Sequence, residues 1–129
     1  EKIPRAKTVR GIAHTVHPKY PDFFLNLAKN GAEPSLILTP AVFRIIRENY
    51  REMLEEWLEC TNAHLYVPET EIRFSFVVTD LNVSLSLFYT TGAFDSRHDV
   101  VSDEPSAREW GESIFAYYRK GSREIFSLD

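Results

Sequence analysis

The feature that most constrains the fold is a change in hydrophobic period near residue 63. Before that point apolar or aromatic residues recur at the spacing of one helix face, and beyond it apolar and polar residues alternate as they do in strands. The helical set consists of Val42, Ile46, Tyr50, Met53, Leu54, Trp57 and Leu58. A chain with both periods is expected to pack helices against a sheet, as α/β and α+β proteins do.

The start of this helical stretch carries its own signals. Thr39 is placed to cap the free backbone amides, and Pro40 suits the first helical position. We therefore predict one long helix that carries the whole apolar set on one face.

Shorter patterns predict the elements around that helix. The β-branched strand "VRGIAHTVHP" precedes a helix that ends at Gly31, and the apolar strand "PSLILTP" follows. After the long helix come the strand "HLYVPE" and a hairpin that turns near Asp80 and Asn82.

The last helix is predicted to follow a loop rich in Asp and Ser. Asp103 can cap this helix, Pro105 fits its first turn, and Gly121 ends it. On the same helix we expect the Trp110 indole to fill the core and Gly111 to allow close packing against the sheet.

The predicted order is β-α-β-α-β-β-β-α. Helical crossovers imply parallel early strands and the hairpin adds antiparallel ones, so the fold class is α/β (α+β), a mixed β-sheet flanked by helices. Alternation gives the hairpin two faces. The face expected beneath helices comprises Ile72, Phe74, Phe76, Val78, Val83, Leu85, Leu87 and Tyr89. The polar face comprises Arg73, Ser75, Thr79, Ser84 and Ser86.

Composition excludes several classes of protein. The net charge of −4 and the pI of about 5.6 offer no basic footprint for a phosphate backbone, so direct nucleic-acid binding is not expected. A single cysteine, Cys60, suits the reducing cytoplasm, where we expect the protein to act. No apolar run reaches the roughly 18 residues of a membrane span. Residues 1–129 fit a single domain.

The motifs of common metal and catalytic sites are absent from the sequence. His14 and His17 are three residues apart, which points their side chains to opposite faces of a strand, so no metal site is expected there. No glycine-rich phosphate loop, G-x-S-x-G elbow or H-E-x-x-H motif occurs, so no cofactor is predicted.

The stretch "RFSFVVTD" resembles the His-x-Lys-x4-Asp pattern that the phospholipase D superfamily carries before a hairpin turn. In that alignment Arg73 stands at the His position, Ser75 stands at the Lys position, and Asp80 keeps the Asp. An arginine stays protonated and cannot act as the nucleophile, so the alignment excludes hydrolysis by that mechanism. A cationic group beside hydroxyls remains, which suits binding of a small anionic effector.

A family resemblance extends from about residue 9 to residue 119. It is carried by the stretches "VHPKYPDFFLNLAKNGAEPSLILTPAVF", "FVVTDLNVSLSLF" and "GAFDSRHDVVSDEPSAREWGESIFAYYR". They resemble the C-terminal regulatory domain of archaeal winged-helix transcription regulators of the methanogenesis-regulatory type. This resemblance implies a non-catalytic domain that senses a ligand or mediates dimerisation. Its scaffold would be similar to one half of a phospholipase D protein. It also implies that the domain forms a homodimer. The domain is further expected to be part of a longer chain that binds DNA through an N-terminal winged helix.

The residues expected to bind a ligand lie on the hairpin and its neighbours: Arg73, Ser75, Ser86, His17, Tyr20 and Asp95. Asp95 is open to two interpretations, because its carboxylate can meet a ligand or only hold the turn through a backbone hydrogen bond. Two alternative functions also stay open. One is a phosphodiesterase-like enzyme with its site at a dimer interface, and the other is a purely structural adaptor.

Overall fold

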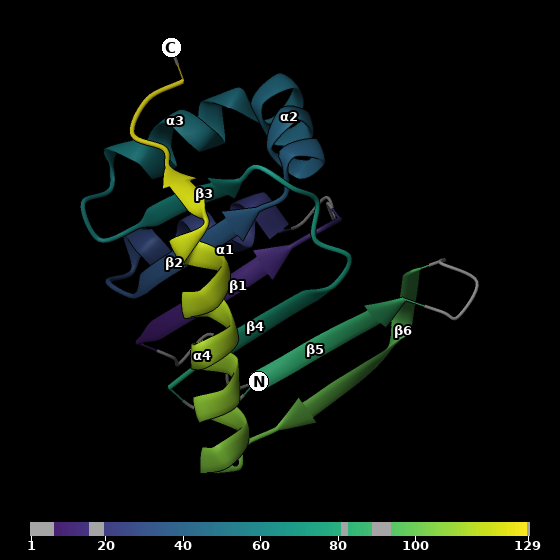
Figure 1. Cartoon of the computed structure of the whole chain (residues 1–129). Coiled ribbons are helices and arrows are strands. Elements are labelled where there is room, and N and C mark those ends of the chain that lie inside the picture. The colour runs from purple at the N-terminus through teal and green to yellow at the C-terminus, as the bar shows by residue number, and fades with distance from the viewer. Residues whose placement is uncertain (1–6, 16–19, 81–82, 89–93, 129) are drawn as a thin grey trace.

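The computed structural model describes residues 7–15, 20–80, 83–88 and 94–128 (Figure 1), with the backbone alone described at residues 20, 83–88 and 94–101. Its elements are, in chain order, β1 (Thr8–Ala13), α1 (Tyr20–Lys29), β2 (Glu33–Leu38), α2 (Pro40–Asn49), α3 (Arg51–Glu59), β3 (His64–Pro68), β4 (Ser75–Thr79), β5 (Val83–Phe88), β6 (Phe94–Ser102), α4 (Pro105–Lys120) and β7 (Ser122–Glu124). None of the described helices has the length and apolar character needed to cross a membrane.

The strands form one sheet of seven, in the order β6-β5-β4-β1-β2-β3-β7. The pairs β1–β2 and β2–β3 are parallel, because a helical crossover joins their strands. The pairs β1–β4, β4–β5, β5–β6 and β3–β7 are antiparallel. The mixed sheet flanked by helices that the sequence predicts is therefore confirmed.

Helices cover both faces of this sheet (Figure 1). On one face α4 packs over a cluster of Ile12, Ile37, Ile72, Phe76, Val78 and Phe115. On the other face lie α1, α2 and α3, whose larger cluster includes Leu25, Leu38, Val42, Phe43, Leu54, Trp57, Leu65 and Val67. Consecutive residues Ile37 and Leu38 enter opposite clusters, so β2 is apolar on both faces, as predicted.

The predicted long helix is two helices, which corrects that expectation. Thr39 does cap α2, since its Oγ1 accepts a hydrogen bond from the Val42 amide at 3.4 Å. Tyr50 leaves the helical conformation with φ −132° and ψ 36°, and α3 starts at the next residue. The apolar stripe survives the break because Leu54 and Trp57 of α3 still pack on the cluster that contains Val42.

Three further expectations about the C-terminal third are wrong. Residues 94–102 form β6 rather than a loop, and β7 was not predicted at all. The hydrogen-bonded ladder with β5 holds β6 extended although Asp, Ser and His favour loops. The N-cap of α4 is Glu104 rather than Asp103, while Pro105 takes the first helical position as predicted.

Trp110 also departs from its expected place. Its side chain is 48% exposed, so the indole does not fill the core, although its ring lies 6.4 Å from that of Phe76. Gly111, the next residue, is buried where α4 meets the sheet, as predicted. Trp110 therefore lies at the margin of α4, with part of its ring beside buried Phe76 and the rest exposed.

Candidate ligand pocket at the carboxyl ends of the parallel strands

The carboxyl ends of β1 and β2 meet at one edge of the sheet because these strands run parallel. His14 and Thr15 follow β1 directly, and Thr39 follows β2 and begins α2. In open α/β sheets, ligands bind outside the carboxyl ends of the strands. A ligand-binding site is therefore expected at this edge.

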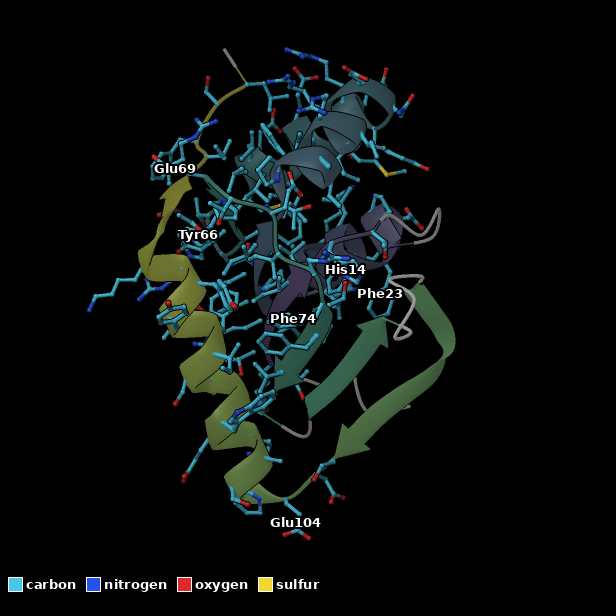
Figure 2. All side chains as sticks on the ribbon, turned by 45° about the vertical axis from the view of Figure 1, so that its right-hand side comes forward. His14, Phe23, Tyr66, Glu69, Phe74 and Glu104 are labelled. Carbon is cyan, nitrogen blue, oxygen red and sulfur yellow. The ribbon has the colours of Figure 1, made fainter. Side chains whose placement is uncertain are left out.

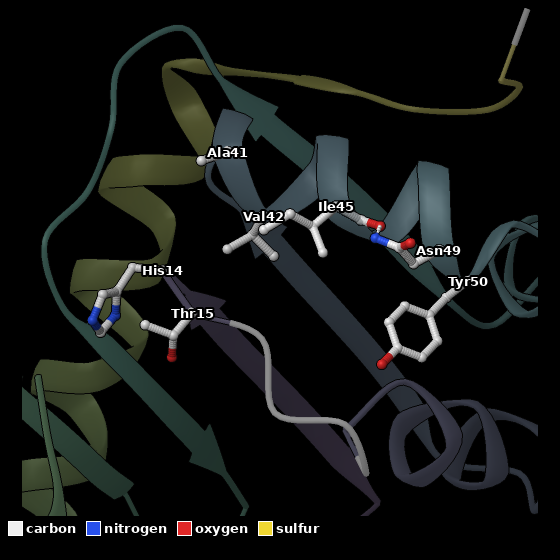
Figure 3. Close-up of a pocket in the computed structure, with 7 residues that line it drawn as sticks. All are labelled: His14, Thr15, Ala41, Val42, Ile45, Asn49 and Tyr50. Carbon is white, nitrogen blue, oxygen red and sulfur yellow. Dashed lines mark hydrogen bonds between the residues drawn. The ribbon is translucent and has the colours of Figure 1, made fainter.

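A pocket of about 510 Å³ opens at this edge. The described residues that line it are His14, Thr15, Ala41, Val42, Ile45, Asn49 and Tyr50. Figure 3 shows His14 at one end of the pocket, Tyr50 at the other, and α2 running between them. The volume lies within the roughly 300–1,000 Å³ of small-molecule sites, and none of these lining residues is Lys, Arg, Asp or Glu.

His14 links the pocket to the start of β4. Its backbone amide donates to the Ser75 Oγ at 3.1 Å, and its Nδ1 lies 2.5 Å from the same oxygen. His14 lies close to Phe74 (Figure 2). Burial lowers the pKa of the His14 imidazole below its usual 6.5, while a hydrogen bond to the Phe74 backbone raises it by less. The imidazole therefore stays neutral near pH 7.

The N-terminus of α2 beside the pocket is already occupied by a carboxylate. Glu71 Oε2 accepts a hydrogen bond from the Ala41 amide at 3.2 Å, and Thr39 satisfies the amide of Val42. A helix N-terminus attracts anions through its free amides and its dipole. Here the protein supplies its own anion, so this helix end does not offer an open anion site.

Sequence comparison assigns the chain to a protein family. The family described as Methanogenesis regulatory protein FilR1, middle domain, matches residues 1–121. The chain belongs to this family. The FilR1 assignment confirms the type of regulator that the sequence resembles, although the family describes a middle domain rather than a C-terminal one. No curated protein sequence matches the chain.

Two solved structures share the fold of this FilR1-family domain. TrmBL2, described as an archaeal chromatin protein with a novel mode of DNA binding, has a TM-score of 0.74 at 10% identity over 93% of this chain. The chain spans only 47% of that structure. Nuc, a phospholipase D family member from Salmonella typhimurium, has a TM-score of 0.65 at 13% identity over 97% of this chain and 86% of that one. The fold is thus phospholipase D-like, and at such identities the likeness does not extend to activity.

Two of the predicted ligand residues are backbone partners in the sheet of this FilR1-family fold. Ser75 of β4 is directly opposite Ser86 of β5 in the antiparallel register. Arg73 precedes β4 and is exposed, and it is not among the described residues that line the pocket. Asp80, the retained acidic residue of the hairpin, accepts hydrogen bonds from the amides of Lys7 and Thr8 at 3.0 and 3.3 Å, so it fixes the start of β1.

The other predicted ligand residues are placed less completely. Tyr20 begins α1 and Asp95 is the second residue of β6, and only their backbone is described. His17 lies outside the described residues, so the prediction that its side chain and that of His14 point to opposite faces is not tested. Ligand binding by these residues and by Arg73, Ser75 and Ser86 stays a prediction. Within the described part of the chain, no three His, Cys, Asp or Glu side chains come together as a metal site would require.

Sequence reasoning missed most of the pocket. Thr15 and Asn49 carried no motif, and Tyr50 was assigned to the apolar stripe of a continuous helix. The useful signal was positional, because residues just after β1 and just after β2 share an edge whenever those strands are parallel.

Proposed function

We propose that this FilR1-family domain senses a small molecule within a longer transcription regulator and does not catalyse a reaction. The observation that carries the proposal is the pocket between the end of β1 and α2. In this proposal DNA is bound by an N-terminal winged helix of the longer chain, and the regulator acts in the cytoplasm.

The lining of the pocket favours a small organic ligand with an apolar body. Val42 and Ile45 offer aliphatic surface on α2, while Thr15, Asn49 and Tyr50 offer hydroxyl and amide groups. Such a mixture buries a ligand by the hydrophobic effect and orients it by a few hydrogen bonds. The small anionic effector expected from Arg73 is a separate prediction, since the described lining has no Lys or Arg.

A sensor must transmit occupancy of its pocket to the rest of the protein. His14 lines the pocket and also contacts Ser75 through both its backbone and its ring. A ligand that contacts His14 therefore acts on the start of β4 and, through the β4–β5 pairing, on the hairpin. A ligand that prefers one arrangement of this contact shifts the population of that arrangement.

Besides the phospholipase D-like fold, the contact between His14 and Ser75 supports the enzyme alternative, because a histidine beside a hydroxyl is the arrangement of an activated nucleophile. However, the Ser75 Oγ also accepts the backbone amide of His14, so it ties β1 to β4. The enzyme alternative predicts turnover of phosphodiester or ester substrates that a Ser75→Ala variant abolishes. The sensor proposal predicts no turnover by either protein.

Ligand-induced stabilisation tests the sensor proposal. We expect at least one compound, from a set of neutral hydroxyl- or amide-bearing molecules and small anions, to raise the thermal midpoint of the chain. At 100 times its dissociation constant a ligand adds roughly 2.7 kcal/mol to the free energy of unfolding. Ile45→Trp should remove the stabilisation, because the larger ring fills the pocket from a residue that is already 42% exposed.

A matched substitution on the same helix controls for this change. Arg44 is exposed on α2 and is not among the described lining residues, so Arg44→Trp should keep the ligand response. Arg73→Gln should weaken the response to anionic compounds alone. The proposal fails if no compound stabilises the chain, or if Ile45→Trp leaves the response intact.

A further inference from the structure

Helix α4 has an exposed side that nothing in the described part of the protein covers. Its inner side faces the sheet through Ala107, Gly111, Ile114, Phe115 and Tyr118. The exposed side, here called the outer stripe, consists of Ser106, Glu109, Trp110, Ser113, Ala116, Tyr117 and Lys120. Trp110 lies at its margin, where its ring is 6.4 Å from that of buried Phe76. In Figure 1 this helix lies on the outside of the sheet.

The outer stripe has the composition of a protein interface. Trp110 is 48% exposed and Tyr117 is 71% exposed, and they lie two helical turns apart on the same side. Trp and Tyr are the residues most enriched at interface centres, where their rings become buried. Between them lie the small residues Ser113 and Ala116, which allow another helix to approach closely.

The charges at the two ends of the outer stripe suggest that its partner is α4 of a second copy of this chain. Glu109 lies toward the N-terminus of α4 and Lys120 is its last residue. Neither takes part in an ion pair with any residue in the described ranges. The midpoint between them falls between Ile114 and Phe115, and so does the midpoint between Ser113 and Ala116. Reversing the helix about this point therefore places Glu109 opposite Lys120 and Ser113 opposite Ala116.

We infer that the outer stripe is the contact surface of a homodimer in which two α4 helices cross antiparallel about a twofold axis. A twofold contact pairs residue i with residue j and j with i. Glu109 and Lys120, about 16 Å apart along the helix, would then form two ion pairs, with the small residues at the crossing. This inference deepens the homodimer expected of the regulator and does not depend on ligand binding in the pocket.

Charge reversal tests this register of the two helices. Sedimentation equilibrium should show the 129-residue chain as a dimer. Glu109→Lys and Lys120→Glu should each weaken dimerisation about tenfold or more, because each replaces two attractions by two repulsions. An equimolar mixture of the two variants should recover the wild-type affinity as a heterodimer, because every opposed pair is again of opposite sign.

A reversal elsewhere on the surface serves as the control. Glu59→Lys changes an exposed carboxylate at the end of α3 and should leave the dimer unchanged. Circular dichroism and the thermal midpoint of each variant establish that the monomers stay folded. A monomeric wild-type chain, single reversals without effect, or a mixture that fails to associate would each overturn the inference. The ligand response of the monomeric Glu109→Lys variant tests the pocket independently.

Discussion

His14 lines the pocket, contacts the sheet at Ser75 and is expected to make stability depend on pH. Its pKa is lowered by burial. The partly buried imidazole disfavours the charged form, so the unfolded chain takes up a proton at this residue more readily than the folded protein does. The folded state should therefore be sensitive to mild acid through this one side chain.

Mild acid should lower the stability of the folded state through His14. In the unfolded chain His14 titrates near pH 6.5, and in the folded protein it titrates lower. Between these pH values the unfolded state binds more protons, so the free energy of unfolding falls as the pH drops from about 7 toward 5. We predict that His14→Gln loses less stability than the wild type across this window, measured by urea unfolding at several pH values. Parallel pH profiles for the two proteins would show that His14 does not contribute.

Helix ends explain which elements the sequence predicts well. Thr39, Pro40 and Pro105 act locally, so their positions at the starts of α2 and α4 follow from residue type alone. The break at Tyr50 involves neither Gly nor Pro, and β6 has few strand-forming residues in its first half. Pairing with β5 holds β6 extended, and no residue type at Tyr50 marks the helix break, so neither feature follows from the local sequence.

Gly31 provides a test of how α1 ends. Its φ is +94°, which L residues rarely adopt, and a Cβ built there would meet no atom within 4 Å. We predict that Gly31→Ala lowers the free energy of unfolding by about 1–2 kcal/mol through backbone strain alone. Gly121, which follows α4 with φ −93°, is the matched control, and Gly121→Ala should stay within about 0.5 kcal/mol of the wild type in the same denaturation experiment. Equal costs at the two sites would contradict this explanation.

At the scale of the whole molecule, periodicity predicts the layers but not the pocket. The two-residue spacing of Ile72, Phe74, Phe76 and Val78 assigns these residues to the core beneath α4, as the structure shows. The pocket instead joins His14 to Tyr50, and only the parallel pairing of β1 with β2 brings α2 beside the end of β1. The helical crossover predicts that parallel pairing, but the sequence does not indicate which side chains then line the pocket.

A phospholipase D-like fold is also compatible with a regulatory role. The fold is shared with Nuc, yet in this chain Arg73 lies just before β4 and Ser75 begins that strand. Membership of the FilR1 family and the largely uncharged pocket both favour recognition over reaction. Function on a shared scaffold is determined by the site and not by the fold.

An NMR titration of the 14.9 kDa chain with its most stabilising compound tests the central claim most directly. We predict that the backbone amide shifts change first around His14, Thr15, Ala41, Ile45 and Tyr50, with smaller changes at Ser75 across the contact with His14. Changes confined to the outer stripe of α4, or no saturable change at the pocket residues, would contradict the claim that this pocket is the sensing site.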